Sequence, residues 1–381
     1  MTPDYNKESI ELHTKHHGKL EIKVTVPLAT KEDLSRAYTP GVGEVCREIA
    51  RDPKLARVLT IKKNTIAVVS DGSAILGLGN LGPLAAIPVM EGKAAIFKEF
   101  GGVDAFPICL DTQDTEEIIK AVKQLAPVFG GINLEDISAP RCFEIEERLR
   151  KELTIPVMHD DQWGAATVCL AGLINALKLR GITKEEIKVV ITGVGAAGVA
   201  TARLLIAYGV KHLLYCDSKG IIYPERTDLN KEKKELLAAS DLKPMPGTLA
   251  DAVKDAHVFV GLSVPGTLTE EMVKTMAERP IIFAMANPIP EIMPDEAKAA
   301  GVFIMATGRS DYPNQVNNSL VFPGAFRGML ELDHKQFDNA VFVKIAQALA
   351  DYVEHPTPEK IIPSMFDKGV ADLVAKTVKQ G

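Results

Sequence analysis

One stretch decides the fold class of this chain: Ile187-Lys188-Val189-Val190-Ile191-Thr192-Gly193-Val194-Gly195-Ala196-Ala197-Gly198. Its first half is a run of apolar and β-branched residues, which is typical of a buried strand. Its second half fits the pattern G-x-G-x-x-G and leads into a helix-forming sequence. A strand, a glycine turn and a helix in this order predict an α/β fold.

The glycine run Gly193-Val194-Gly195-Ala196-Ala197-Gly198 predicts a Rossmann-type dinucleotide site. Its backbone amides can approach a pyrophosphate closely, and the helix N-terminus stabilises the phosphates. Nineteen residues after Gly198 (217 minus 198), Asp217 ends the next expected strand and could accept hydrogen bonds from the adenosine ribose, which favours NAD over NADP. Lys219 could instead meet a 2′-phosphate, so the choice of NAD or NADP stays open. The alternative is a plain βα turn that binds nothing.

Length and composition limit the possible classes. The 381 residues are 46% hydrophobic and 25% charged, which fits a globular protein of two domains. The net charge is −6 (44 basic minus 50 acidic residues), and no extended basic face indicates a nucleic-acid partner. The five cysteines form no C-x-x-C pair, which favours a reducing cytoplasm. Neither a signal peptide nor a membrane-spanning apolar stretch is indicated.

The region before the glycine run alternates between apolar runs and helical stretches. We expect strands at 66–70, 106–110, 131–134 and 155–158, with helices at 114–126 and 140–152. Acidic residues follow each expected strand: Asp71, then Asp111, then Glu135-Asp136, then Asp160-Asp161. Because ligands bind outside the carboxyl ends of parallel strands, these acids mark an expected site.

Further expected elements set the domain boundaries. A helix at 163–179, stopped by Gly181, leads to strands at 187–192, 212–216, 257–261, 281–285 and 302–306. We therefore predict an N-terminal α/β domain over 1–162 and a Rossmann-type domain over 163–330. After a polar loop at 311–318, C-terminal helices in 331–381 are expected to pack back on the first domain.

The N-terminal residues contain one more expected strand and a capped helix. Residues 19–26 alternate as a half-buried strand does. Thr30 and Asp33 predict a capping pair for the next helix, which delivers Tyr38.

Two adjacent acidic pairs indicate a metal site. Glu135-Asp136 and Asp160-Asp161 follow successive strands, and concentrated carboxylates repel one another unless a cation compensates them. Ligands made only of oxygen suit Mg²⁺ or Mn²⁺ better than Zn²⁺. A lone aspartate would be better explained as a helix cap or a solvated loop residue. His159 fits a core or capping role, and we do not make it a ligand.

Tyr38 and Lys93 are candidate acid and base residues. Tyr38 comes immediately before the turn Thr39-Pro40-Gly41, from which its hydroxyl could project into a cleft as an acid. Lys93 lies in the apolar stretch 85–97, where burial would lower its pKa towards that of a general base. The alternatives are a packed tyrosine and a lysine that reaches back to solvent.

Together these segments resemble the malic enzyme family from about Ser35 to Arg327. The matching motifs are Tyr38-Thr39-Pro40, Asp71 to Gly82, Gly92-Lys93, Glu135-Asp136, Asp160-Asp161-Gln162-Trp163-Gly164, Phe283 to Pro288 and Asn317 to Gly324. Several separate motifs agree in order, which makes the resemblance specific. One position departs: larger members carry a substrate-gripping arginine where this chain has Ala74.

The resemblance implies oxidative decarboxylation of L-malate to pyruvate and CO₂ with reduction of NAD⁺ or NADP⁺, and oxaloacetate as a further substrate for decarboxylation. Glu135, Asp136 and Asp161 would hold the divalent cation. Lys93, helped by Asp160, would take the hydroxyl proton of malate.

The resemblance also implies roles at the edges of the site. Tyr38 would protonate C3 of the enol product, while Asn287 and Asn318 would orient malate and the nicotinamide ribose. Malic enzymes are commonly dimers or tetramers, so a homo-oligomer is expected.

Two other functions stay open on the sequence. A dehydrogenase that does not decarboxylate could share the Rossmann half without using a metal, although Glu135, Asp136 and Asp161 argue against it. A regulatory module could bind a dinucleotide without turnover. Metal-dependent turnover of malate would exclude both.

Overall fold

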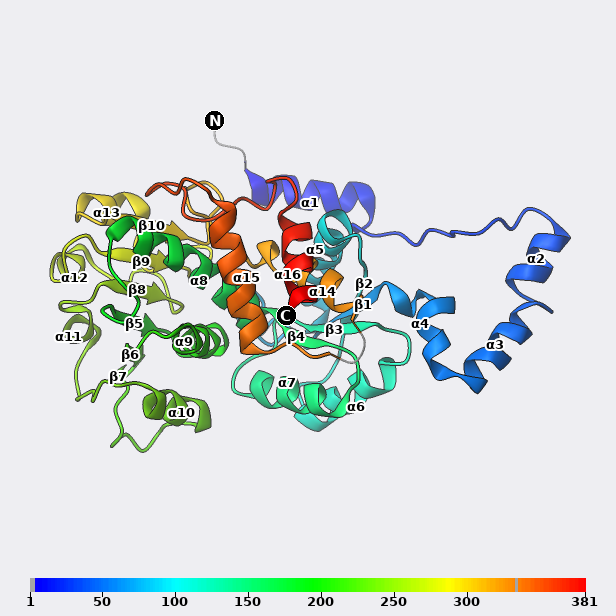
Figure 1. Cartoon of the computed structure of the whole chain (residues 1–381), viewed down its shortest axis with the longest axis horizontal. Helices are drawn as coiled ribbons and strands as arrows, with labels where there is room; N and C mark the ends of the chain where they lie inside the picture. Colours follow the sequence, from blue (N-terminus) through cyan, green and yellow to red (C-terminus); the bar gives the residue numbers. More distant parts are fainter. Residues whose placement is uncertain (1–3, 333–334) are drawn as a thin grey trace.

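The computed structural model describes residues 4–332 and 335–381, which form two α/β bodies side by side (Figure 1). The first body is built on a four-stranded parallel sheet in the order β2-β1-β3-β4. Its strands are β1 (Thr65–Ser70), β2 (Asp104–Cys109), β3 (Gly131–Leu134) and β4 (Val157–His159). Its helices are α5 (Pro83–Gly101), α6 (Thr115–Leu125) and α7 (Arg141–Glu152). The four strands confirm the expected ones to within two residues.

The second body is built on a six-stranded sheet in the order β10-β9-β8-β5-β6-β7. Its strands are β5 (Lys188–Thr192), β6 (His212–Asp217), β7 (Gly220–Ile221), β8 (Val258–Gly261), β9 (Ile281–Ala284) and β10 (Ile304–Thr307). Only β7, which the sequence did not predict, runs antiparallel to its neighbour. Its helices are α9 (Ala196–Tyr208), α10 (Lys231–Ala239), α11 (Leu249–Val253), α12 (Glu270–Lys274) and α13 (Pro294–Ala299).

Helices cover both faces of this sheet. Val189 and Ile191 of β5 belong to the large core cluster that includes α8 and α9 residues, whereas Val190 belongs to the cluster beneath α11, α12 and α13. Successive side chains of a strand point to opposite faces, so burial of all three requires cover on each side. The predicted doubly covered α/β architecture is confirmed.

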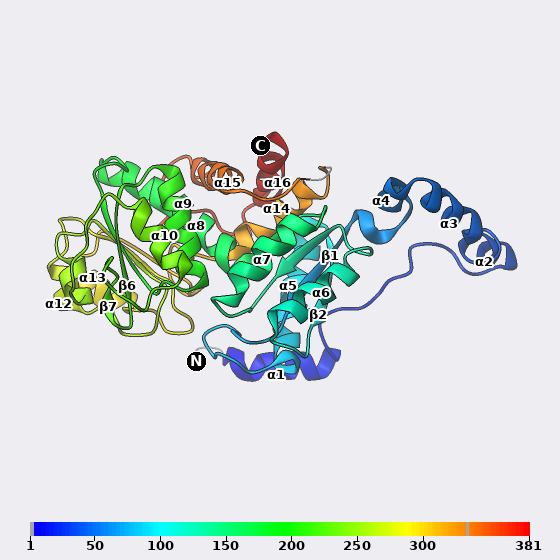
Figure 2. The same cartoon turned by 90° about the horizontal axis from the view of Figure 1, so that it is seen from below.

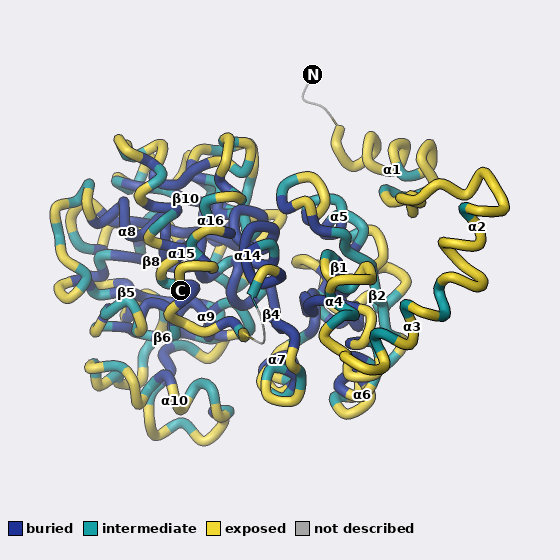
Figure 3. Tube along the Cα trace, turned by 45° about the vertical axis from the view of Figure 1, so that its right-hand side comes forward, coloured by how far each residue is buried: buried dark blue, intermediate teal, exposed yellow. Residues whose placement is uncertain are grey.

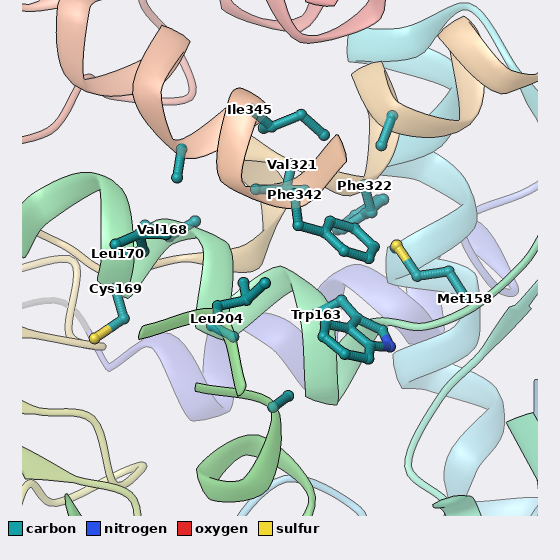
Figure 4. Packing of buried hydrophobic residues seen from close by; sticks show 14 of the residues in the cluster. Met158, Trp163, Val168, Cys169, Leu170, Leu204, Val321, Phe322, Phe342 and Ile345 are labelled. Carbon is teal, nitrogen blue, oxygen red and sulfur yellow. The ribbon is translucent and has the colours of Figure 1, made fainter. Parts of the chain in front are cut away.

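Helix α8 (Asp160–Arg180) leads from β4 into the second body, and all but a few of its residues are buried. Its Trp163 stacks on Phe342 of α15 (Asn339–Tyr352), with ring centroids 5.1 Å apart, in a core that both bodies share (Figure 4). Helix α14 (Phe322–Met329) contacts α5, α15 contacts α8 and α9, and α16 (Val370–Gln380) contacts α14 and α15. The C-terminal helices thus contact elements of both bodies.

Residues 20–51 form an arm that extends away from the first body and contains α2 (Lys31–Ala37) and α3 (Val42–Arg51) (Figures 1 and 2). Before the arm, α1 (Tyr5–His16) lies beside α5, where Lys19 Nζ donates to the Pro88 carbonyl oxygen at 2.6 Å. After it, α4 (Ala56–Leu59) and the short 3₁₀ helices η1 (Pro53–Leu55) and η2 (Ile61–Lys63) lead back to β1. None of residues 4–64 is buried (Figure 3).

The N-terminal predictions are partly right. The capping pair is confirmed, because Thr30 accepts a hydrogen bond from the Asp33 amide and Asp33 accepts one from Thr30. The strand expected at 19–26 is wrong: the segment pairs with no strand in the described part of the chain, and Ile22 and Val24 are 84% and 63% exposed. Alternation requires a neighbouring strand and a covering layer, and one copy of the chain supplies neither.

Candidate active site

The chain order of the strands places one site between the two bodies. In the first sheet, β2 and β3 lie on opposite sides of β1, and in the second β6 and β8 lie on opposite sides of β5. Such switch points leave a crevice at the carboxyl ends of the strands. A cavity of about 440 Å³ lies there, lined by residues of both bodies. Lys93, Glu135, Asp136, Asp161, Ala197, Asn287 and Asn318 are among its lining residues.

Three carboxylates meet at one end of the cavity. Glu135, Asp136 and Asp161 each offer one oxygen, and these oxygens lie within 4.8 Å of one another. The Asp136 amide donates to Asp161 Oδ2 at 2.7 Å, and Asn133 Nδ2 donates to Glu135 Oε2 at 3.0 Å. Asp136 adopts a left-handed backbone (φ 53°), an uncommon conformation for a residue other than glycine. Backbone and side-chain contacts therefore fix the three carboxylates in a cluster.

The negative charges of these three carboxylates are poorly balanced by the positive charges and hydrogen-bond donors of the chain itself. Burial raises the pKa of Glu135 well above its usual range, and it raises the pKa of Asp136 to about 7 with help from the charge of Asp161. Asp136 Oδ2 is buried and has no hydrogen-bond partner among the described residues. An oxygen-only cluster with an unpartnered buried oxygen fits a hard divalent cation such as Mg²⁺ or Mn²⁺.

Lys93 on α5 lies beside this cluster and is largely buried, with 8% of the residue exposed. Its Nζ forms a hydrogen-bonded ion pair with Asp160, lies 3.0 Å from Glu135 Oε1, and sits 4.4 Å from the centroid of the Phe322 ring. Burial alone would lower the pKa of Lys93, but the charges of Asp160 and Glu135 outweigh it and raise the pKa. Our expectation of a lowered pKa is therefore wrong for the chain by itself.

A buried glutamate that the sequence analysis missed supports this end of the site. Glu146 accepts hydrogen bonds from the His159 amide at 3.0 Å, from Gln162 Nε2 at 3.1 Å and from Trp163 Nε1 at 2.8 Å. It thereby holds the chain on both sides of Asp160 and Asp161. A signal was present: positions 142, 145, 146 and 149 follow the i, i+3, i+4, i+7 spacing of a buried helix face.

The glycine run meets the cavity from the second body through Ala197, which is among the lining residues. A side chain at Gly193 (φ 87°) would lie 2.1 Å from the Leu262 carbonyl oxygen, and one at Gly198 would lie 2.1 Å from the Gly193 carbonyl oxygen. Gly195, which precedes α9, has open space around it. The three positions match the tight turn, the ligand approach and the close helix packing of a dinucleotide-binding turn.

The remaining candidate residues separate into two groups. Asn287 and Asn318 line the cavity. Tyr38 does not: it is 66% exposed at the end of α2, on the arm (Figure 3). Asp217 ends β6 as expected, but Arg226 and Lys233 already bond to its carboxylate. Ala74, at the position where the sequence analysis noted a missing arginine, lines the cavity. Among the described lining residues, Lys93 is the only one with a basic side chain.

Comparisons with known proteins identify this arrangement. The family described as "Malic enzyme, N-terminal domain" matches residues 17–150, and that described as "Malic enzyme, NAD binding domain" matches residues 163–379. The chain belongs to the malic enzyme family. The first malic enzyme match covers α5, Glu135 and Asp136, and the second covers the glycine run.

Similar malic enzymes span nearly the whole chain. The NAD-dependent malic enzyme of Geobacillus stearothermophilus is 55% identical, covering 95% of this chain and 76% of that protein. The bifunctional malic/malolactic enzyme of Bacillus subtilis is 52% identical, covering 98% and 92%. The crystal structure of the Thermotoga maritima NAD-dependent malic enzyme has a TM-score of 0.95 at 47% identity, covering 97% of this chain and 98% of that one.

These findings confirm the family resemblance, the α/β class and the assignment to NAD(P)-dependent oxidoreductases. They do not favour a dehydrogenase without decarboxylation or a regulatory module. Among residues 4–332 and 335–381, no helix has both the length and the apolar character needed to cross a bilayer.

Proposed function

We propose that the chain catalyses the oxidative decarboxylation of L-malate to pyruvate and CO₂, with NAD⁺ or NADP⁺ as hydride acceptor and Mg²⁺ or Mn²⁺ as essential ion. One observation carries this proposal: a buried acidic cluster with an adjacent lysine faces the start of α9, at Ala197 of the glycine run, across a single cavity. A cavity of about 440 Å³ accommodates a four-carbon acid beside a nicotinamide ring.

Glu135, Asp136 and Asp161 would hold the cation, and Gly193 to Gly198 the pyrophosphate. The dinucleotide supplies a hydride acceptor, and the cation supplies an electrophile for the hydroxyl and carboxylate oxygens of malate. Asn287 and Asn318 would orient the substrate and the nicotinamide ribose through amide hydrogen bonds.

Lys93 and Asp160 would move the hydroxyl proton. Without a cation, the negative charges of the neighbouring carboxylates raise the pKa of Lys93 and keep its Nζ protonated. This nitrogen would become a base only when a bound cation offsets those charges. The C2 hydroxyl proton would then pass to Lys93 Nζ and be shared with Asp160, to which that nitrogen is hydrogen-bonded. The order of events follows from the electrostatics: cation first, proton transfer second.

Tyr38 would donate the proton that C3 of the enol requires, and a second copy of the chain would supply it. The arm that carries Tyr38 has no buried residue and stands away from α5 in two perpendicular views (Figures 1 and 2). Its exposed apolar side chains include Leu20, Ile22, Val24, Val26, Leu28 and Leu34. A homo-oligomer in which each arm covers its partner would bury these side chains and complete each site.

The five cysteines are all free thiols, which supports a location in the reducing cytoplasm.

The reaction is tested by following reduction of NAD⁺ and NADP⁺ with L-malate and Mn²⁺ while pyruvate is assayed in the same samples. We expect reduced cofactor and pyruvate in equal amounts, both lost on chelation. Reduction without pyruvate, or turnover that survives chelation, would overturn the proposal.

The shared site is tested by co-expressing Tyr38→Phe and Lys93→Met chains with different affinity tags and purifying the mixed oligomer. Each variant alone should lose about a hundredfold or more in turnover. If Tyr38 acts on the partner's cavity, the purified mixed dimer has one intact site of its two, so it should recover about half of the activity per site. Pairing Lys93→Met with Asp136→Asn is the matched control, because both changes lie in the body and no pairing restores a site. A mixed Tyr38/Lys93 oligomer without activity would contradict exchange of the arm.

A further inference from the structure

A second cavity lies between α7 of the first body and α9 and α10 of the second, and its volume is about 490 Å³. It shares no described lining residue with the candidate active site, and its described lining includes neither the glycine run nor Asp217. Eight of its eleven lining residues are charged, four acidic and four basic, so its walls carry no net charge. This cavity is therefore polar and separate from the candidate active site.

Most of the charges around this cavity pair with one another. Glu147 Oε1 lies 2.6 Å from Lys151 Nζ, and Glu147 Oε2 lies 3.6 Å from Lys231 Nζ. Glu235 Oε2 lies 3.0 Å from Arg203 Nη2, and Glu235 Oε1 lies 3.9 Å from Lys231 Nζ. The pair of Glu147 and Lys231 joins α7 to α10 and so connects the two bodies across the cavity.

Two charges of the lining have no such partner. Arg150 lies in the last turn of α7 and Glu232 in the first turn of α10, and both are half-buried. Neither side chain forms a hydrogen bond or an ion pair with any residue in the described part of the chain. Each charge suits its own helix end, because a helix dipole favours cations at the C-terminus and anions at the N-terminus. The cavity therefore offers one free cation and one free anion, from two different bodies.

The most buried polar lining residues connect the cavity to the acidic cluster. Glu146 and Gln162 are 4% and 1% exposed. Glu146 accepts a hydrogen bond from Gln162 Nε2 and another from the amide of His159, two residues before Asp161. A ligand bound against Glu146 and Gln162 would therefore contact the groups that hold Asp161 in place.

We propose that this cavity binds a zwitterionic amino acid, with its carboxylate on Arg150 and its ammonium on Glu232, and that the bound amino acid increases the affinity of the acidic cluster for its cation. A guanidinium can hold a carboxylate through two parallel hydrogen bonds, and a carboxylate accepts hydrogen bonds from an ammonium. A ligand that is only an anion or only a cation would leave one of the two charges without a partner, which selects against it.

The increase in cation affinity follows from where the ligand binds. It would join α7 to α10 beside the pair of Glu147 and Lys231, and so hold the two bodies together around Glu146. This effect rests on the proposed metal site, whereas binding of the amino acid does not.

Thermal unfolding of the metal-free protein with each of the proteinogenic L-amino acids tests binding without turnover. We expect at least one of them to raise the Tm by about 2 °C or more at saturation. Its analogues without the amino group or without the carboxylate should have no effect. If no amino acid raises the Tm, or if either analogue raises it equally, the proposal is overturned.

Variants of the two unpaired residues locate the binding site. Arg150→Gln and, separately, Glu232→Gln should each weaken binding of that amino acid about tenfold or more, as measured by calorimetry. Lys234→Gln is the matched control, because this exposed residue of α10 is not among the described lining residues and should leave binding unchanged. Unchanged binding by Arg150→Gln and Glu232→Gln would place the amino acid elsewhere and refute the assignment.

Mn²⁺ titrations with and without the amino acid test the regulation. We expect the amino acid to lower the Kd for Mn²⁺ about fivefold or more, and Mn²⁺ to lower the Kd for the amino acid by the same factor, because linkage is reciprocal. Arg150→Gln should abolish both changes. Binding with an unchanged or higher Kd for Mn²⁺ would overturn the regulatory role. Absence of malate turnover in a protein that still shows this linkage would refute the proposed reaction alone.

Discussion

The arm and the two-sheet body differ in the exposure of their apolar residues, which are buried in the body and exposed in the arm. In the body, all six residues of β1 are buried, and even Lys93 and Glu135 lie away from solvent. In the arm, Ile22 and Val24 are largely exposed, and α2 and α3 have no buried residue. Helices of 7 and 10 residues gain little stability from their own hydrogen bonds, since isolated helices shorter than about 12 to 15 residues are marginal in water.

The difference shows which parts of the enzyme one chain can complete. The body buries its own core and brings the acids, Lys93 and Ala197 of the glycine run to one cavity. The arm carries Tyr38 but offers its apolar side chains to something outside the chain. Under the proposed role of Tyr38, chemistry that uses both regions would require assembly as well as folding.

The largest expected effect comes from charging the arm. Val24→Asp with Val26→Asp should convert the oligomer to single chains and reduce malate turnover by about a hundredfold or more, because the partner's Tyr38 no longer reaches the cavity. Sedimentation velocity and the malate assay give the two readouts. Thr25→Asp, in the same exposed segment but at a polar position, should change neither. If the variant with the charged arm sedimented with the same mass as the parent oligomer, the arm would not be the region that requires a partner chain.

A change in the acidic cluster should act on the body alone. Asp136→Asn removes one oxygen ligand, so we expect Mn²⁺ affinity to fall about a hundredfold or more with the oligomer intact. The metal-free variant should melt a few degrees higher than the metal-free parent at about pH 8, because one poorly compensated buried charge is gone. Asp111→Asn, an exposed acid after β2, is the control. If the metal-free variant melted at a lower temperature than the metal-free parent, the charge of Asp136 would be balanced by other groups of the chain.

The stability of the metal-free protein should depend on pH because the carboxyl group of Asp136 is buried. The pKa of Asp136 is raised to about 7 in the folded chain, whereas an unfolded aspartate titrates near about 4. Between these values the folded state holds more protons, so stability falls as pH rises and the loss is complete above about pH 7. Melting in chelator should therefore be lower at about pH 8 than at about pH 6, and Mn²⁺ should recover more stability at the higher pH. A slope of the opposite sign would contradict a buried, unpaired acid.

Local pattern predicted the strands and the acids because both depend on neighbours in sequence. Apolar runs located β1, β3 and β5, and the shared direction of parallel strands explains why acids 25 residues apart, such as Asp136 and Asp161, meet. Helix α5 was missed, since Pro88 and Gly92 lie inside it and both are unfavourable in a helix. There, tertiary packing overrides local propensity.

The charge states could not be predicted from local pattern. Whether the pKa of Lys93 rises or falls depends on Glu135 and Asp160, more than 40 residues away in sequence. The strand expected at 19–26 failed for a related reason, because its neighbours are absent from a single copy. Sequence periodicity shows which face of a segment is apolar, but it does not show what covers that face.

The smallest expected effect tests the support beneath the acids. Glu146→Gln keeps one acceptor oxygen but turns an amide NH₂ towards the donors of His159, Gln162 and Trp163, so we expect a loss of about 1–3 kcal/mol in the free energy of unfolding. Because the same contacts hold the chain on both sides of Asp160 and Asp161, Mn²⁺ affinity should also fall, by about tenfold. Urea unfolding and Mn²⁺ titration measure the two effects, and Glu147→Gln, at the exposed neighbouring position, is the control. Lower stability with unchanged Mn²⁺ affinity would show that Glu146 serves the core shared by the two bodies and not the acidic cluster.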